Sequence, residues 1–297
     1  MVQGTVRFAA MEILHIPALR NPVMLCAFTG WNDAAEAASR TLEHLLDALS
    51  EVSSDVVSTL IGEIDSDEYF DFQVNRPQVN IDELENRIIT WPSTQVWGVV
   101  VPGFARDLVI VKGIEPSMHW KSFVNEVLDL ADDIEVSLII TIGSLLADVP
   151  HSRPISVGLN ASNPILAKDL GLEISHYEGS TGILGIINDA SSRRGIDAIS
   201  MWAAIPHYAS NAPSPKASLA LIHAIEDFLE LNIPQGELAN EADDWEKEID
   251  ALALEDSDVA DYVKSLEESK DAQDLPEVSG EMIAKEFERY LRRNNQG

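Results

Sequence analysis

Short runs rich in Val and Ile alternate along the chain with longer amphipathic segments, and this alternation constrains the fold more than any other feature. The short runs have the length of buried strands, whereas the longer segments carry apolar residues at helical spacing. Strands that alternate with helices form a sheet whose faces those helices cover. The sequence therefore predicts the α/β class, with a mixed, mostly parallel sheet flanked by helices. A chain of 297 residues is long enough to bury such a core.

The order of the elements can be predicted from the same runs. Strands are predicted at 23–28, 56–61, 87–91, 96–101, 108–111, 137–142 and 198–205. Helices are predicted at 120–130, 182–192 and 215–229. A further helix is predicted after the first strand, because Asp33 and Glu36 have the spacing of a capping box. The middle strands follow one another too closely for crossover helices, so we expect an antiparallel hairpin or meander among them.

Charge divides the chain near Pro234. Residues 1–234 carry 31 acids and 13 bases, whereas the much shorter segment 235–280 carries 16 acids and 3 bases. We therefore predict an α/β body over 1–234 and an acidic helical appendage over 235–297. Three apolar stripes predict three short helices in the appendage: Trp245, Ile249 and Leu252; Val259, Val263 and Leu266; and Ile283, Phe287, Tyr290 and Leu291. These helices either pack on the body or on a neighbouring subunit, or form a docking arm for a partner.

The excess of acids narrows the classes of partner. With 50 acids against 20 bases the formal charge is −30, so the chain would repel a phosphate backbone or an anionic lipid surface. We expect no nucleic-acid partner and no membrane partner. The longest uncharged apolar stretch, 136–147, is also shorter than the roughly 18 residues of a membrane helix. The single Cys26 allows no internal disulfide and no export signal is recognised, so we expect a cytoplasmic protein.

Polar residues gather in the loops that follow the predicted strands. Ligands of open α/β sheets bind beyond the carboxyl ends of the strands, so these loops could line one pocket. The candidate pocket residues are Asn32, Asp33, Glu115, Ser144, His151, Arg153, Ser180, Thr181 and His207. Several also have an ordinary structural interpretation, such as a helix cap for Asp33 or Ser180. A ligand pocket and purely structural roles therefore both stay open.

No catalytic motif is recognised among these residues. The segment 179–182 could present a helix N-terminus to an anion, but it lacks the lysine of a P-loop and the spacing of a dinucleotide fingerprint. Ser144 and Ser180 do not lie in a Gly-x-Ser-x-Gly elbow. The seven histidines lack zinc-site spacing, and Cys26 lies in an apolar run typical of a core. We expect no metal and no cofactor, assign no catalytic residue and leave enzyme activity undecided.

A polar loop at 71–77 is a candidate interaction surface. It follows two aromatic residues, Tyr69 and Phe70, and has neither helical nor alternating periodicity. Such a loop often binds a partner, or is ordered at a subunit contact. The candidate interface residues are Trp31, Asp71, Gln73, Asn75, Arg76 and Tyr208. Several of the six tryptophans fall in predicted loops or at element ends, which favours their burial in a closed homo-oligomer.

Four blocks of sequence, taken in order, resemble a known family. They are 27–34 (AFTGWNDA), 71–77 (DFQVNRP), 177–182 (YEGSTG) and 202–208 (WAAIPHY) with 214–217 (SPKA). Over about residues 10–232 the chain resembles the actinobacterial-type branch of the proteasome assembly chaperone 2 family. The resemblance implies a phosphorylase/hydrolase-like α/β fold and an oligomer, with a trimer slightly favoured over a dimer. It also implies relatives that assist or bind proteasome particles.

Two functional hypotheses follow. The first is a non-enzymatic cytoplasmic protein that binds or assembles other proteins, as the resemblance implies. The alternative is a small-ligand binder, or a hydrolase or phosphorylase-like enzyme, that uses the strand-end loops. Relatives in the family engage proteasome subunits through a terminal hydrophobic-Tyr-x tail. Here Tyr290 lies well before Gly297, so docking through such a tail is not expected.

Overall fold

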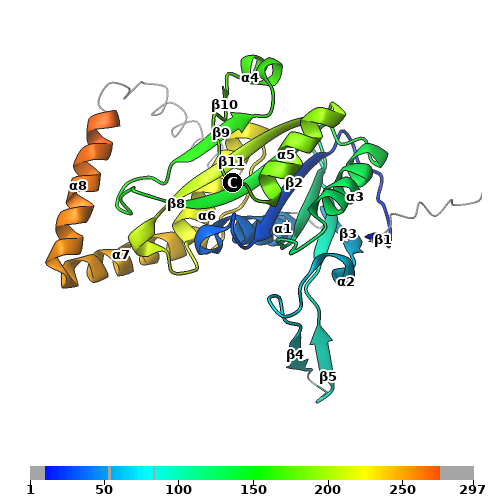
Figure 1. The fold of residues 1–297 in the computed structure, drawn as a ribbon, viewed down its shortest axis with the longest axis horizontal. Helices are drawn as coiled ribbons and strands as arrows, with labels where there is room; N and C mark the ends of the chain where they lie inside the picture. The colour runs from blue at the N-terminus through cyan, green and yellow to red at the C-terminus, as the bar shows by residue number, and fades with distance from the viewer. Residues whose placement is uncertain (1–10, 53–54, 83, 275–297) are drawn as a thin grey trace, which may run out of the picture.

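The computed structural model describes residues 11–52, 55–82 and 84–274, which form a sheet with helices on both faces (Figure 1). The main sheet consists of β1 (Met11–Ile13), β2 (Val23–Thr29), β3 (Val57–Ile64), β6 (Thr94–Val100), β7 (Leu108–Ile114), β8 (Leu138–Ala147), β9 (Val157–Ala161), β10 (Glu173–Ile174) and β11 (Asp197–Pro206). A separate two-stranded ribbon consists of β4 (Gln78–Ile81) and β5 (Arg87–Thr90). The α-helices are α1 (Ala37–Val52), α2 (Ser66–Tyr69), α3 (Trp120–Asp133), α4 (Pro164–Leu170), α5 (Ile183–Arg194), α6 (Pro215–Leu229), α7 (Leu238–Glu255) and α8 (Ser257–Asp274), and two 3-10 turns are η1 (Ala34–Glu36) and η2 (His207–Ala209).

The strands of the main sheet follow the order β1-β3-β6-β7-β2-β8-β11-β9-β10. The central strands β7, β2, β8 and β11 are parallel to one another. On one side β6, β3 and β1 continue the sheet in antiparallel pairs, and on the other β9 pairs antiparallel with β11. The predicted α/β fold with a mixed sheet is therefore confirmed, and the β6–β7 hairpin confirms the expected antiparallel pairing among the middle strands.

Each face of the sheet has its own apolar core. Strand β2 serves both cores, because Leu25 and Ala27 point to one face while Met24 and Cys26 point to the other. Helices α1 and α6 cover the first face, and α3 and α5 cover the second (Figure 1). A strand covered on both faces has no polar side, so β2 is an uninterrupted apolar run in the sequence.

One local prediction is confirmed at a different place in the fold, and one is wrong. The strand predicted at 87–91 is present as β5, but it pairs with β4 in a separate ribbon that projects from the body (Figure 1). Its apolar composition is that of a sheet strand, yet its side chains are exposed. The predicted capping box between Asp33 and Glu36 does not form. A 3-10 turn precedes α1, and Glu36 lies in the left-handed region with φ of 55°.

The appendage forms two helices within the described residues. Helix α7 packs on α6 and buries Leu238, Ala242 and Trp245. Helix α8 follows after the single residue Asp256 and runs at a steep angle to α7 (Figure 1). The third predicted stripe, at 283–291, lies outside the described residues. In the part of the chain that the structure describes, no helix combines the length and the apolar character needed to cross a membrane.

Candidate functional site

Most of the candidate pocket residues fall into two groups with separate hydrogen-bond partners. We name the first the strand-end cluster, which consists of Asn32, Asp33, Glu115 and Ser144. We name the second the rim cluster, which joins His151, Arg153, Tyr208 and Lys216 of the body to four acids of the appendage.

Glu115 joins three elements in the strand-end cluster. It follows β7, and its amide donates to the carbonyl of Thr29 at the end of β2 (2.9 Å). Its Oε1 accepts hydrogen bonds from Asn32 Nδ2 (2.7 Å) and from the amide of Ile183 (2.9 Å), the first residue of α5. A carboxylate at a helix N-terminus satisfies an unpaired amide and interacts favourably with the helix dipole. The Glu115 carboxylate thus occupies the N-terminus of α5, which the sequence offers as a place for an anionic ligand.

Asp33 lies just before the 3-10 turn η1 and caps the first amides of α1, which follows that turn. Its Oδ1 accepts from the amides of Ala38 (2.8 Å) and Ser39 (3.2 Å), and its Oδ2 accepts from Ser39 Oγ (2.6 Å). Burial raises the pKa of the Asp33 carboxyl, and the hydrogen bonds from Ser39 and Ala38 oppose that rise. The capping role given to Asp33 as its structural interpretation is therefore present, although its partners differ from those of a capping box.

Ser144 ties the loop after β2 to β8. Its amide donates to the carbonyl of Asn32 (2.9 Å), and its Oγ donates to the carbonyl of Ala34 (2.8 Å). Asn32, Asp33 and Ser144 are all buried. Their polar atoms hold backbone in place, as buried polar groups must when no water reaches them. These buried contacts are typical of a structural role and not of an open ligand pocket.

Ser180 and Thr181 lie on an exposed loop before α5. The carbonyl of Ser180 accepts a hydrogen bond from Tyr177 Oη (2.8 Å). Gly182 follows them at a point of close approach, because a Cβ there would lie 2.1 Å from Asn32 Nδ2. This segment therefore approaches Asn32 of the strand-end cluster at the glycine.

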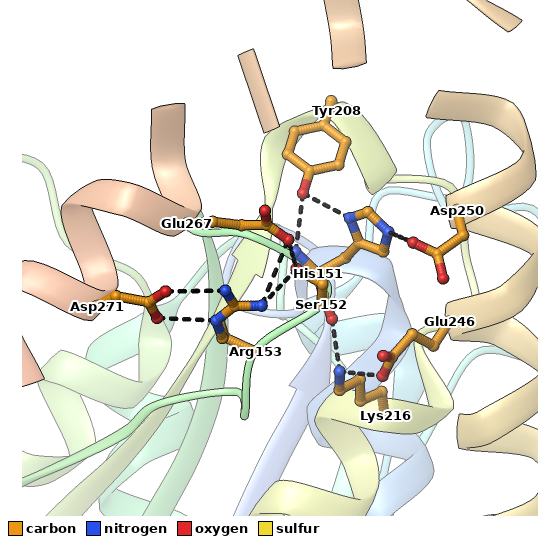
Figure 2. A network of polar contacts seen from close by, with 9 residues as sticks. All are labelled: His151, Ser152, Arg153, Tyr208, Lys216, Glu246, Asp250, Glu267 and Asp271. Carbon is orange, nitrogen blue, oxygen red and sulfur yellow. Dashed lines mark hydrogen bonds and ion pairs between the residues drawn. The ribbon is translucent and has the colours of Figure 1, made fainter. Parts of the chain in front are cut away.

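The rim cluster sits where the acidic appendage meets the body (Figure 2). His151 is 1% exposed, its Nδ1 lies 2.8 Å from Tyr208 Oη, and its Nε2 lies 3.0 Å from Asp250 Oδ1 on α7. A carboxylate can only accept, so Nε2 carries the proton, and in a neutral ring Nδ1 accepts from Tyr208. Lys216 at the start of α6 donates to the carbonyl of His151 and forms an ion pair with Glu246.

Arg153 binds α8 through two carboxylates. Its Nε and Nη2 donate to Asp271 at 2.8 and 2.9 Å, and its Nη1 lies 3.4 Å from Glu267 (Figure 2). The side chain of Ser152 also donates to Glu267. The bidentate hydrogen bond raises the pKa of the Arg153 guanidinium and holds the pKa of the Asp271 carboxyl below its usual range. Two acids of α8 thus clamp one arginine of the body.

Aromatic rings complete the rim cluster. His207 Nδ1 lies 3.2 Å from Asp148 Oδ1, and the His207 ring meets the rings of Tyr208 and Tyr262 edge-on at 5.9 and 5.5 Å. Tyr262 of α8 also donates to Asp148 (3.1 Å). His207 therefore contacts the appendage, and its predicted place in one pocket with Asn32 and Ser180 stays a prediction.

A Tyr–His–Asp arrangement could be mistaken for a catalytic triad. A nucleophile, however, needs a lowered pKa or a base that takes its proton at neutral pH. Burial raises the pKa of the Tyr208 hydroxyl to about 12, and nearby acids add to the rise. This hydroxyl also accepts from the amide of His151 (2.8 Å), which fixes it in place. Tyr208 thus binds both the amide and the ring of His151, and His151 in turn binds Asp250 of α7.

The predicted interface loop at 71–77 forms the base of the ribbon. Asp71 Oδ1 accepts from the amide of Gln73 (2.8 Å), Asn75 Nδ2 donates to Ser117 Oγ (3.2 Å), and the ring of Phe72 packs on Trp91 at 5.0 Å. Gln73 and Arg76 are exposed. Among the other candidate interface residues, Trp31 is exposed, whereas Tyr208 belongs to the rim cluster.

The ribbon presents apolar side chains to solvent. Every residue of β4 and β5 is exposed, and Ile81 reaches 73%. The exposed apolar residues of the ribbon and of its base are Val74, Val79, Ile81, Leu84, Ile88, Ile89 and Trp91. A two-stranded ribbon is marginally stable in water without a further strand or a covering surface. This surface therefore has the character of a binding surface.

An open depression of about 240 Å³ lies elsewhere on the sheet. Its lining residues are Thr29, Ser39, Glu43, Ser93, Gln95, Lys112, Gly113 and Ile114. None of the candidate pocket residues lines it. Among the described residues, no group of three or more His, Cys, Asp or Glu side chains is arranged to hold a metal ion. Cys26 is buried, and burial raises the pKa of its thiol, as expected of a core cysteine.

Several functional candidates were missed from the sequence. In the rim cluster they are Lys216, Glu246, Asp250, Glu267 and Asp271. The acids come in two pairs with a spacing of four residues, 246 with 250 and 267 with 271, which places each pair on one helix face. This spacing was a usable signal, but the composition of the appendage contains so many acids that the pairs do not stand out. The ribbon residues were seen as a sheet strand.

Comparisons with known proteins give one consistent answer. A model of the PAC2 family matches residues 27–253. The structure of a PAC2 family protein from Streptomyces avermitilis is 46% identical, with 82% of this chain and 99% of that chain covered and a TM-score of 0.75. A proteasome-assembly chaperone homologue from Mycobacterium tuberculosis is 39% identical, with 81% and 99% covered and a TM-score of 0.72.

More distant structures share the fold. The archaeal proteasome activator PbaB of Pyrococcus furiosus is 17% identical, with 82% of this chain and 97% of that chain covered and a TM-score of 0.65. No curated protein matches this chain. The range matched by the family model ends within α7, so α8 lies outside it.

Proposed function

Because the chain belongs to the PAC2 family, we propose that it is a non-enzymatic assembly factor that acts in the cytoplasm as a closed homo-oligomer, with a trimer favoured over a dimer. Its client is a multi-subunit protein complex, and the proteasome is the first candidate. Two similar structures support this choice, since one is a proteasome-assembly chaperone homologue and one a proteasome activator.

The observation that carries the proposal is the apolar ribbon. Single exposed apolar residues are common on protein surfaces, but the register of the ribbon places Val79, Ile81 and Ile89 together on one exposed face, which favours contact with protein. The strand-end cluster supports the non-enzymatic part, because its polar atoms bind one another and backbone. The body and appendage charges oppose self-association, but screening over about 8 Å at physiological salt limits that cost to charges near the contact.

Self-association is tested with a matched pair of variants of the full chain. Ile81 on the ribbon and Ile165 on α4 are 73% and 75% exposed. Ile81→Asp should reduce the mass measured by light scattering at micromolar concentration, whereas Ile165→Asp should leave the oligomer intact. Because the contact is apolar, the oligomer should persist in 0.15 M salt and should not weaken as salt rises. The mass of a single chain for the wild type would contradict the proposal.

Client assembly is tested by reconstitution. Proteasome subunits of the same organism are mixed with and without the full chain, and particle formation is followed on native gels. The wild type and Ile165→Asp should accelerate formation of the particle, and Ile81→Asp should not.

A thermal-shift screen against nucleosides, phosphates and sugars tests the alternative function, a small-ligand binder, because a true ligand at a hundredfold excess over its Kd adds about 2.7 kcal/mol of stability. We expect no shift, and a rise of several degrees would favour a small-ligand binder.

A further inference from the structure

The apolar stripe of α7 continues in register into α8, although the two helices are bent apart. Its members are Leu238, Ala242, Trp245, Ile249, Leu252, Asp256, Val259, Val263 and Leu266, which follow in alternating steps of four and three residues. This heptad spacing is typical of a helix that packs along one continuous face. Asp256, the polar member of the stripe, is the residue at the bend.

Asp256 caps α8 at the bend. Its backbone is extended, with φ of −125° and ψ of 114°, and its Oδ1 accepts from the amide of Asp258 (2.9 Å), as an N-cap of α8 does. In a straight helix this cap would be lost, and the charged carboxylate would fall among the apolar residues of the stripe. The bend in turn leaves Leu252 60% exposed. A straight helix would thus exchange this cap for a continuous apolar face.

The docking site of α8 on the body is the loop at residues 148–156 together with His207 and Tyr208 of η2, whose rings meet the ring of Tyr262 at 5.5 and 6.1 Å. Tyr262 donates to Asp148, Asp271 and Glu267 bind Arg153, and Lys270 Nζ donates to Ser156 Oγ (3.3 Å). Most of these groups are partly exposed. Among the side chains of α8 whose burial is described, that of Val263 is buried. The same loop on another copy offers the same partners, because nothing in these contacts depends on the chain to which α8 belongs.

We propose that α7 and α8 straighten into one helix and that α8 then docks on the 148–156 loop of a second copy of this chain. Helix α8 extends about 27 Å beyond the bend at 1.5 Å per residue, which allows it to reach across a subunit boundary. The proposal rests on the self-association proposed above. A tethered α8 is present at about millimolar effective concentration, so a neighbouring α8 competes only when an oligomer holds it close.

Cross-linking between two different chains tests the exchange. Ser156→Cys and Lys270→Cys are made as single variants of the full chain, with a size tag on one, and the two are co-expressed and treated with a short bis-maleimide. These positions keep the Arg153 contacts, and Cys26 is buried, so it does not react. The double variant S156C/K270C and each single variant alone serve as controls for links within a chain and between like positions.

A cross-link between the two differently tagged chains supports exchange. A link that forms only within the double variant overturns it, and the absence of any link also overturns it, because α8 would then not dock on this loop. Light scattering separates this failure from that of the proposed function. An oligomeric mass without a link between chains removes the exchange alone, whereas the mass of one chain removes the self-association as well.

The role of Asp256 has its own matched pair. Asp256→Leu removes the cap and completes the stripe, so the fraction of links between chains should rise about fivefold or more, since a cap is worth about 1 kcal/mol and 1.4 kcal/mol is tenfold. Glu255→Leu removes the same charge off the stripe and should change the fraction little. An equal response of the two variants would show that Asp256 does not select the bent form.

Discussion

The strand-end cluster and the rim cluster both contain polar residues that follow strands, yet they differ in their exposure to water. In the strand-end cluster Asn32, Asp33 and Ser144 are buried; the side chains of Asp33 and Ser144 bind backbone, and that of Asn32 binds Glu115. In the rim cluster Arg153 and Asp271 are partly exposed and bind each other. Buried hydrogen bonds are costly to leave unmade, whereas exposed ion pairs contribute little. The first cluster therefore supports the fold, and the second controls where the appendage lies.

The largest effect is expected from Gly182→Ala, which adds one methyl group beside Asn32 of the strand-end cluster. In Gly182→Ala the new Cβ would lie 2.1 Å from Asn32 Nδ2 and 2.3 Å from its Oδ1, so the loop after β2 or the start of α5 must move. Such overpacking costs about 1–3 kcal/mol, or several degrees of Tm in a chain of this size. Gly158→Ala in β9 is the control, because a Cβ there meets no atom within 4 Å. Equal Tm values in a thermal melt would contradict the role given to this close contact.

A somewhat smaller loss is expected from Asp33→Ala. The variant leaves the amides of Ala38 and Ser39 without their acceptor inside the body, which should cost about 2 kcal/mol of the free energy of unfolding. Asp65→Ala removes a comparable but exposed cap on the short α2 and should cost much less. Urea denaturation of the two variants measures the difference. If both lose the same amount, burial does not set the strength of these caps.

Arg153→Ala should change the position of α8 more than it changes the free energy of unfolding. Removal of a partly exposed ion pair should change the free energy of unfolding by less than about 1 kcal/mol. Amide hydrogen exchange over 257–274 should nevertheless become fast, while α7 stays protected through Trp245. Arg193→Ala removes an arginine paired with Asp189 within α5 and should leave α8 protected. Slow exchange in α8 of the Arg153 variant would contradict the clamp.

The smallest expected effect is a pH dependence of the α8 contact. The Asp271 pKa is lowered by the hydrogen bond from Arg153, so the docked state favours the ionised carboxyl. Its contribution is complete above the ordinary Asp pKa of about 3.9 and is lost as pH falls through the lowered value. An NMR titration of the Asp271 carboxyl should show the lowered pKa in the wild type and the ordinary one in Arg153→Ala. The same value in both would show that Arg153 does not cause it.

The sequence predicted the elements that have a period and missed those that depend on distant contacts. The helix at Pro215–Leu229 was predicted with its bounds, because Pro215 and the apolar spacing mark it locally. The edge strands β1 and β10 have three and two residues, too few for a periodic signal. Whether β5 lies in the main sheet depends on its partner β4, which composition does not reveal.

The candidate sites show the same difference between local signals and distant contacts. Asp33 could be recognised as a cap from its position after a strand, and the structure gives it that role with other partners. His151 and Arg153 were placed with Asn32 because all three follow strands in the chain. Their actual partners, Asp250 and Asp271, lie on the appendage about a hundred residues later, and the choice among many acids depends on how α7 and α8 pack. The 71–77 loop and the other interface candidates stay predictions.

The position of β2 between β7 and β8 has a consequence for synthesis of the chain. On the ribosome β2 is made early and can pair with β7 once residues 108–114 have emerged. Its other edge stays open until β8, residues 138–147, is available. An apolar strand with an unpaired edge is a template for wrong pairing between nascent chains. A pause in translation between β7 and β8 should therefore increase aggregation of the nascent protein, whereas a pause after β11 should not.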